Sequence, residues 1–151
     1  MRLEFAGAPE VTAAREEVWA RLMDPSFVAA SAPGVESVEP VDATHFRVIS
    51  GIGVGPLKVR FQLDVELSDV VPLEQVRMTA LGRAPGSAVD TISTVRLEPV
   101  GNGRTRLHWA ATSTVSGAVA SLGPRFVEGA ARRLTEDFWT DFARRVDDGR
   151  R

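Results

Sequence analysis

The last third of the chain most constrains the fold, because one long amphipathic helix follows an extended stretch of strand-like sequence. We predict this helix from Ala118 to Val146, since its apolar residues recur every three or four positions and so share one face. These residues are Val119, Leu122, Phe126, Ala130, Leu134, Phe138 and Phe142. A long helix after a run of antiparallel strands suggests a curved sheet that wraps around it. Such a wrap leaves room for a cavity between sheet and helix.

The length and composition indicate one globular domain. The chain has 151 residues, 44% of them hydrophobic and 25% charged, and its net charge of −2 does not favour a nucleic-acid partner. The absence of cysteine excludes disulfides, thiolate nucleophiles and cysteine-ligated metals. We find neither a signal sequence nor an apolar run long enough to span a bilayer, so we expect a cytoplasmic protein. The predicted domain covers residues 1–147, and residues 148–151 form a frayed tail.

Seven strands and two short helices are predicted before the long helix. A strand over residues 2–12 is confined to a sheet edge or a bulge by Pro9. A short helix with Thr12 or a neighbour as its cap then ends at Asp24-Pro25, and a second helical turn lies at residues 27–30. A loop is expected over residues 82–86. The remaining strands are predicted over residues 35–41, 44–51, 57–67, 76–81, 89–97 and 104–115.

The strand over residues 57–67 alternates apolar and polar residues throughout, which indicates one buried and one wet face. The same alternation identifies the side chains that we expect to face the cavity and bind a ligand. They are Phe61, Leu63, Met78, Thr91, Ser93, Leu107, Trp109 and Ser113 from the sheet, with Phe126 and Ala130 from the helix. Phe27, Pro33 and Pro85 lie on connections that could form the cavity rim.

The predicted cavity is mostly apolar with a few hydroxyl groups. Burying Thr91, Ser93 or Ser113 without a partner would cost about 1–3 kcal/mol each, so these groups need each other, water or a ligand. One interpretation is a small-ligand site, in which a few polar groups orient an apolar molecule. The alternative is a packed core in which the hydroxyls bond to nearby backbone.

No catalytic or metal-binding group is predicted. The sequence has no Gly-x-Ser-x-Gly elbow and no tyrosine, and no general acid and base fall together in the expected cavity. His45 and His108 are too far apart in the sequence to suggest a metal site. The glycines at 51, 53 and 55 precede Pro56 and a strand, whereas a phosphate loop opens a helix. A strand-to-strand turn is therefore expected there, and no cofactor is predicted.

Short motifs spread over nearly the whole chain resemble the CoxG family of carbon monoxide dehydrogenase proteins, within the helix-grip, START-like (SRPBCC) superfamily. They are Leu3–Gly7, Glu17–Trp19, Asp24–Pro25, Ala32–Ser37, Gly53–Pro56, Gly103–Leu107, Gly117, Leu122–Gly123, Gly129–Ala131 and Asp137–Phe138. The resemblance implies an α+β helix-grip fold, with a seven-stranded antiparallel sheet around the C-terminal helix. It also implies no catalysis.

Members of this family are associated with molybdenum-containing carbon monoxide dehydrogenases and related hydroxylases, in maturation or membrane recruitment. Some are thought to carry a quinone-like lipid between membrane and enzyme. Two features differ here: Ser31 and Val35 stand where many members place a cysteine, and the sequence stops at Arg151, where some members continue to a membrane anchor. Stable membrane attachment is therefore not expected, although peripheral contact at the inner face of the membrane fits the resemblance.

The resulting hypothesis is a non-enzymatic carrier or accessory protein that holds a hydrophobic small molecule, such as a quinone-like lipid, for a carbon monoxide dehydrogenase-type enzyme. One alternative is an assembly or membrane-recruitment module that docks on an enzyme and holds no ligand. A second is a small cyclase or hydrolase of the START-like superfamily.

Overall fold

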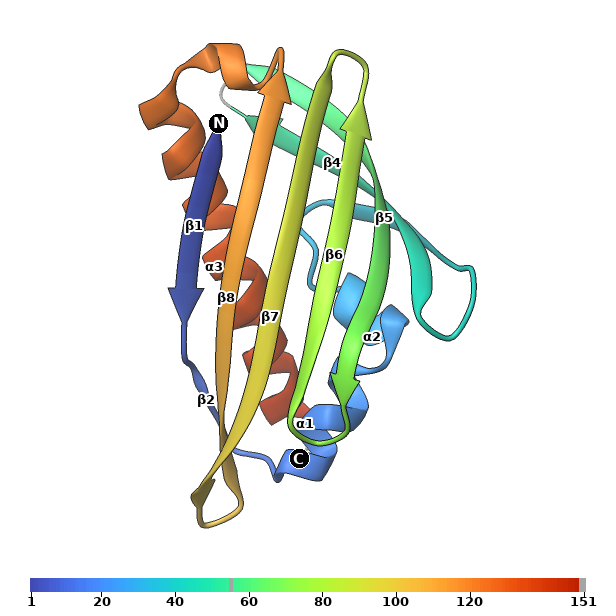
Figure 1. The fold of residues 1–151 in the computed structure, drawn as a ribbon, viewed down its shortest axis with the longest axis vertical. Helices are drawn as coiled ribbons and strands as arrows, with labels where there is room; N and C mark the ends of the chain where they lie inside the picture. The colour runs from blue at the N-terminus through green and yellow to red at the C-terminus, as the bar shows by residue number, and fades with distance from the viewer. Residues whose placement is uncertain (55, 150–151) are drawn as a thin grey trace.

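An antiparallel sheet curves around one long helix in the computed structural model, which describes residues 1–54 and 56–149. Figure 1 shows the strands in the order β1-β8-β7-β6-β5-β4-β3, with β2 pairing on β8 beyond β1. The strands are β1 (Arg2–Gly7), β2 (Glu10–Val11), β3 (Val35–Pro40), β4 (His45–Val54), β5 (Leu57–Val71), β6 (Gln75–Ala84), β7 (Ser87–Gly101) and β8 (Arg104–Gly117). The helices are α1 (Arg15–Leu22), α2 (Pro25–Ala29), the 3₁₀ turn η1 (Ala120–Leu122) and α3 (Pro124–Asp148).

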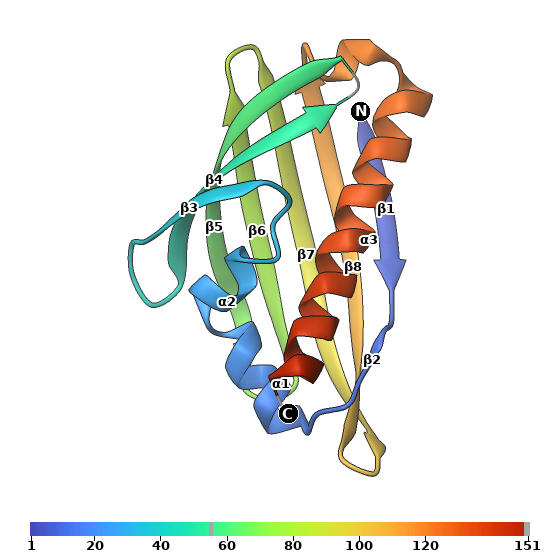
Figure 2. The same cartoon turned by 180° about the vertical axis from the view of Figure 1, so that it is seen from behind.

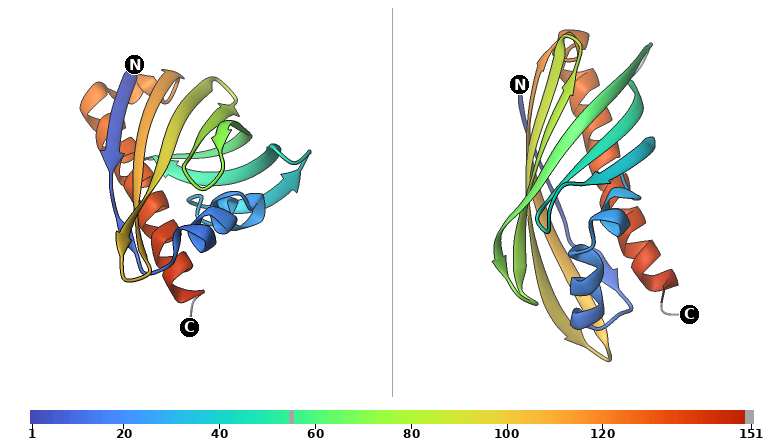
Figure 3. Two further views of the ribbon diagram at one scale, coloured as in Figure 1. Left: turned by 60° about the horizontal axis from the view of Figure 1, so that its bottom comes forward. Right: turned by 90° about the vertical axis from the view of Figure 1, so that its right-hand side faces the viewer.

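The α+β helix-grip prediction is confirmed. Helix α3 runs diagonally across the concave face of the sheet, and α1 and α2 lie at the end of the wrap that holds its C-terminus (Figure 2). Seen from the side, β3, β4 and β5 swing out of the plane of the other strands to the side on which α3 lies, which gives the sheet its curvature (Figure 3). Pro9 interrupts the first strand, and β1 and β2 both lie at the sheet edge, as its missing N–H requires.

The strands are longer than predicted. The loop expected over residues 82–86 is a two-residue turn at Pro85–Gly86, because the β6–β7 ladder continues through Gly82↔Val89 to Ala84↔Ser87. Gly82 is needed within the strand: a Cβ there would lie 2.9 Å from the Val89 carbonyl oxygen. Strand β4 likewise runs through Gly51 and Gly53 to Val54, so most of the expected glycine turn is strand. Gly55 and residues 150–151 lie outside the described residues.

Helix α3 begins six residues later than predicted. Gly123 has a φ of 104°, which no helix can include, and Pro124 follows it at the first helical position. The first short helix also starts differently, with Ala14 rather than Thr12 at its N-cap. The Thr12 amide instead donates to Asp147 Oδ1 at 2.6 Å. The prediction of a second helical turn is confirmed, and Asp24 caps it.

The buried face of α3 agrees with the predicted one at Phe142 and differs from it at Phe126. Its buried side chains are Val127, Trp139, Phe142, Ala143 and Val146, whereas Phe126 is 43% exposed. The predicted face followed a strict four-residue spacing from Phe126 to Phe142. Residues four apart advance about 40° around a helix of 3.6 residues per turn, so Phe126 and Phe142 lie about 160° apart.

An aromatic cluster joins the C-terminal half of α3 to the sheet and to α2. Trp139 stacks on Trp109 of β8 with ring centroids 6.1 Å apart, and its edge meets Phe142 at 5.8 Å. Phe142 in turn contacts Phe27 of α2 at 5.6 Å. Side chains therefore fill this end of the wrap, and Leu107 is completely buried there.

We expect Trp139→Ala to lower the free energy of unfolding by about 3–5 kcal/mol, because it removes a buried ring and leaves a void. Phe126→Ala is the matched control on the same helix and should change stability by less than about 0.5 kcal/mol, since the ring is exposed. Urea unfolding of both variants measures the difference. Equal losses would contradict the helix face described here.

The β3–β4 turn contains a carboxylate–imidazole pair that predicts a local pH dependence. A backbone hydrogen bond from Thr44 is the main cause that lowers the pKa of Asp42 to about 2. The hydrogen bond to Asp42 is the main cause that raises the pKa of His45 above 6.5, and Glu66 adds to it. Stabilisation by protonated His45 is therefore complete below pH 6.5 and is lost as the pH rises through the folded value.

We expect Asp42→Asn to lower the pKa of His45 in an NMR titration of the folded protein. Glu74→Gln is the control, because Glu74 lies in the separate β5–β6 turn and should leave the titration unchanged. A His45 pKa at or below 6.5 in the unmodified protein would contradict the assignment.

Candidate ligand-binding cavity

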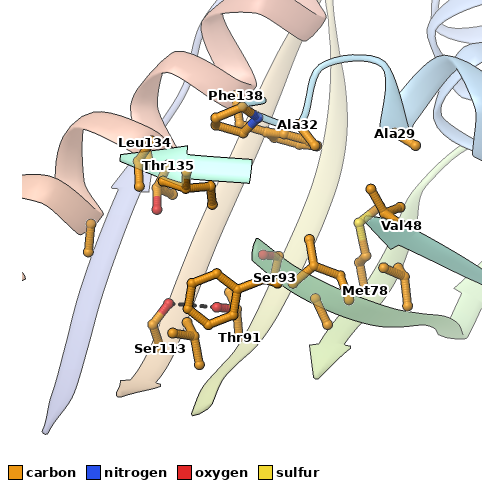
Figure 4. A pocket seen from close by; sticks show the side chains of 18 of the residues that line it. Ala29, Ala32, Val48, Met78, Thr91, Ser93, Ser113, Leu134, Thr135 and Phe138 are labelled. Atoms are coloured by element: carbon orange, nitrogen blue, oxygen red, sulfur yellow. Dashed lines mark hydrogen bonds between the residues drawn. The ribbon is translucent and has the colours of Figure 1, made fainter. Parts of the chain in front are cut away.

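A cavity of about 250 Å³ opens to solvent between the concave face of the sheet and α3. Strands β4 to β8 form its floor, the N-terminal half of α3 its roof, and the connection from α2 to β3 one side wall. Small side chains leave this space open, because Ala80, Ala130 and Ala131 occupy positions where larger residues would meet across it. Trp139 of the aromatic cluster lines one end of the cavity, together with its neighbour Phe138; Figure 4 shows Phe138 there.

The described lining is apolar except for four hydroxyl groups, those of Thr91, Ser93, Ser113 and Thr135. Thr91 and Ser113 face each other across β7 and β8, and their oxygens are 2.8 Å apart (Figure 4). One hydroxyl of this pair donates to the other, so one proton of the pair remains free. Of the partners expected for the buried hydroxyls, which were each other, water or a ligand, the structure shows the first for these two.

Ser93 has no hydrogen-bond partner for its side chain within residues 1–54 and 56–149, although only 8% of its surface is exposed. Thr135, on the opposite wall, also lacks a side-chain partner among the described residues. The cavity therefore offers neutral hydroxyls to an occupant from both the floor and the roof. In the part of the chain that the structure describes, no charged side chain lines it.

Seven of the ten predicted ligand-binding residues line this cavity. They are Phe61, Leu63, Met78, Thr91, Ser93, Ser113 and Ala130. Leu107 and Trp109 do face the concave side, but they lie farther along β8 in the packed aromatic end. Phe126 is exposed on the outside of α3. That the lining residues bind a ligand stays a prediction.

One of the three residues predicted at the cavity rim lines the cavity, and two do not. Pro33 lines the cavity, whereas Phe27 lies against Phe142 and beneath Arg145. Pro85 is exposed in the β6–β7 turn and does not line the cavity. Sequence reasoning missed the contribution of β4 and part of that of α3, which together include Phe46, Val48, Ile52, Val127, Ala131, Thr135 and Trp139. The alternation of apolar residues along β4 could have identified its three lining residues. A buried helix face centred on Val127, in place of the predicted one, would have identified the four on α3.

Within the described lining, no acid, base or nucleophilic pair faces the cavity. His45 and His108 lie on the outer face, where His108 Nε2 is 2.9 Å from Glu98 Oε1. Among the described residues, no group of three or more His, Cys, Asp and Glu side chains could hold a metal ion. None of the described helices is both long enough and apolar enough to cross a membrane.

Solved structures share this fold. A conserved protein from Geobacillus kaustophilus is 26% identical, with a TM-score of 0.87 over 97% of this chain and 96% of that one. The Zhui aromatase/cyclase from a Streptomyces species is 16% identical, with a TM-score of 0.75 over 100% of this chain and 97% of that one. A START superfamily protein from Mycobacterium smegmatis is 14% identical, with a TM-score of 0.68 over 96% and 97% of the two chains.

No curated protein sequence matches the chain. Its sequence does match the family model of the carbon monoxide dehydrogenase protein CoxG, over residues 7–147. This match covers most of the chain, and the fold agrees with the START-like structures. The chain therefore belongs to the CoxG family of carbon monoxide dehydrogenase proteins.

Proposed function

We propose that this protein is a non-enzymatic carrier or accessory protein that holds an uncharged hydrophobic molecule in the cavity under α3. The observation that carries the proposal is the open apolar space with unpartnered hydroxyls at Ser93 and Thr135 among the described residues. Binding would remove apolar ligand surface from water, worth about 25 cal/mol per Å². The family name supports a carbon monoxide dehydrogenase-type redox enzyme as the partner that the carrier serves.

The lining supports a ligand without net charge. A carboxylate or phosphate inside the cavity would lose its water and meet no cation, because the described lining side chains are neutral. Hydroxyl protons at Ser93 and at the Thr91–Ser113 pair suit a carbonyl oxygen. A quinone-like head group combines these properties, being flat, uncharged and edged with carbonyls.

The size and opening of the cavity support a ligand that is only partly enclosed. A volume of about 250 Å³ lies below the usual range of about 300–1,000 Å³ for small-molecule sites. A ring-sized head group would fit inside, and an attached chain would leave through the open side.

The chemistry of the lining also supports a binding role over an enzymatic one. General acid–base or nucleophilic catalysis needs titratable or activated groups beside the substrate. The described lining offers hydroxyls alone, and none of them contacts a histidine or carboxylate that could activate it.

Filling the cavity should abolish ligand retention. We expect Ala80→Phe to do so, because Ala80 lies on the cavity floor, while the control Ala110→Phe adds the same ring to the exposed outer face of β8. Solvent extraction and mass spectrometry should recover an apolar molecule from the unmodified protein and from Ala110→Phe, but not from Ala80→Phe. If the unmodified protein yields no apolar molecule and also fails to bind the neutral dye Nile red, the carrier proposal is contradicted. The docking module without a ligand would then remain as the alternative.

Removing the unpartnered hydroxyl should weaken binding of a carbonyl-bearing ligand. We expect Ser93→Ala to lower the affinity for menadione by about two- to tenfold, the effect of one hydrogen bond of about 0.5–1.5 kcal/mol. Ser50→Ala is the control, since Ser50 is fully buried but lies outside the cavity lining. Displacement of Nile red measures both affinities, and naphthoate, an anion of similar size, should displace the dye poorly. Strong displacement by naphthoate would contradict an uncharged ligand.

A further inference from the structure

The connection between α1 and β3 forms one side wall of the cavity, and we call residues 24–34 the wall segment. Four of its residues face the cavity: Val28, Ala29, Ala32 and Pro33. In Figure 2 the segment arches from α2 towards α3 and returns to the edge of the sheet at β3. Figure 4 shows Ala32 beside Phe138 of α3, where the wall meets the roof. Displacing this segment would widen the cavity.

The two ends of the wall segment are fixed, while its own backbone bonds are local. At one end the Asp24 amide donates to the Arg21 carbonyl of α1 at 3.2 Å, and at the other the Gly34 carbonyl accepts from the Gly51 amide at 2.9 Å. Gly34 has a φ of 65°, and a Cβ there would lie 1.9 Å from the Gly51 oxygen. Between these ends, the backbone amides from Val28 to Ala32 bond to carbonyls between Asp24 and Ala29. These bonds are local, so none of them ties the middle of the segment to α3.

Two side chains of α3 hold the middle of the segment: Phe142 packs on the Phe27 ring, and Arg145 supplies the hydrogen bonds. Arg145 Nη1 donates to the Phe27 carbonyl at 2.6 Å and to Ser31 Oγ at 2.8 Å. The Arg145 guanidinium also lies 4.1 Å from the centre of the Phe27 ring. Within the described part of the chain, the only other hydrogen bond from residues 25–33 to another element is the turn bond from the Val35 amide to the Ala32 carbonyl, beside the fixed end at Gly34.

Arg145 differs from its neighbour in the kind of partner it has. Arg144 is exposed and forms ion pairs with Asp141 and Asp148 on its own helix. Arg145 is half-buried and pairs with no described carboxylate; its partners are a carbonyl, a hydroxyl and a ring. Water can replace such neutral partners when the guanidinium swings out, whereas breaking a buried ion pair would strand a charge. The contact is therefore suited to reversible release.

We propose that Arg145 is a latch that holds the wall segment against α3, and that its release opens the cavity for ligand passage. This inference rests on the proposed carrier function for its purpose, but the latch itself is a property of the fold. Arg145 does not line the cavity. It acts as a positioning residue through Phe27 and Ser31.

The test compares Arg145→Met with Arg144→Met, two neighbouring substitutions that remove the same charge. In Arg145→Met we expect hydrogen exchange of the amides at residues 28–32 to accelerate by about tenfold or more, while exchange in β7 and β8 stays unchanged. Stopped-flow measurements should show Nile red entering and leaving faster by a similar factor, with little change in its affinity. Arg144→Met should match the unmodified protein in both measurements.

Ser31→Ala is the second variant, for use if Arg145→Met fails to fold. It keeps the charge of Arg145 and removes one of its two hydrogen bonds. We expect a smaller acceleration in the same amides. Unchanged exchange at residues 28–32 in the variants that fold would overturn the latch, whatever the dye does. Faster exchange with unchanged dye rates would overturn its role in ligand passage. Failure of Nile red to bind the unmodified protein would instead contradict the carrier function, and the exchange data would still decide the latch.

Discussion

The stacking of Trp139 on Trp109 is the contact on which the rest of the molecule depends. It fixes the C-terminal half of α3 against β8, and Phe142 extends the contact to Phe27 of α2. Large rings bury much apolar surface and hold defined geometries, so this half of the helix is fully anchored. The N-terminal half forms the roof of the cavity, whose floor includes Ala80 and the hydroxyl-bearing Thr91, Ser93 and Ser113. The cavity therefore results from large aromatic residues at one end of α3 and small or hydroxyl-bearing residues around the other end.

This division also separates the part of the molecule that packs tightly from the part that we propose binds a ligand. The packed end contains the completely buried Phe142 and Leu107, while the open end contains Ala80, Ala130 and Ala131. Small side chains at the open end forgo packing that larger residues would provide. The wall segment lies between the two ends, since Phe27 belongs to the aromatic cluster and Pro33 to the cavity.

Alternation along the strands predicted the fold and most of the cavity floor, because a two-residue period decides which face of a sheet a side chain joins. It could not predict where along a strand the cavity ends. Leu107 and Trp109 are on the correct face, yet the rings of α3 fill the space beside them. The position of Phe126 was wrong because a strict four-residue spacing drifts around a helix. The latch at Arg145 joins residues more than a hundred positions apart, and no local pattern contains it.

The pairing of Thr91 with Ser113 ties the polarity of the cavity to the register of the sheet. The two residues are direct cross-strand partners, so a slip of β7 by one position would turn the Thr91 hydroxyl to the outer face, away from Ser113. Polar groups along β7 can face the interior only at every second residue, at steps of about 7 Å. Val89, Thr91, Ser93 and Val95 occupy successive steps of this kind. The register therefore fixes the spacing of the oxygen atoms along the cavity floor, and under the proposed carrier function that spacing would select ligands by the distance between their polar atoms.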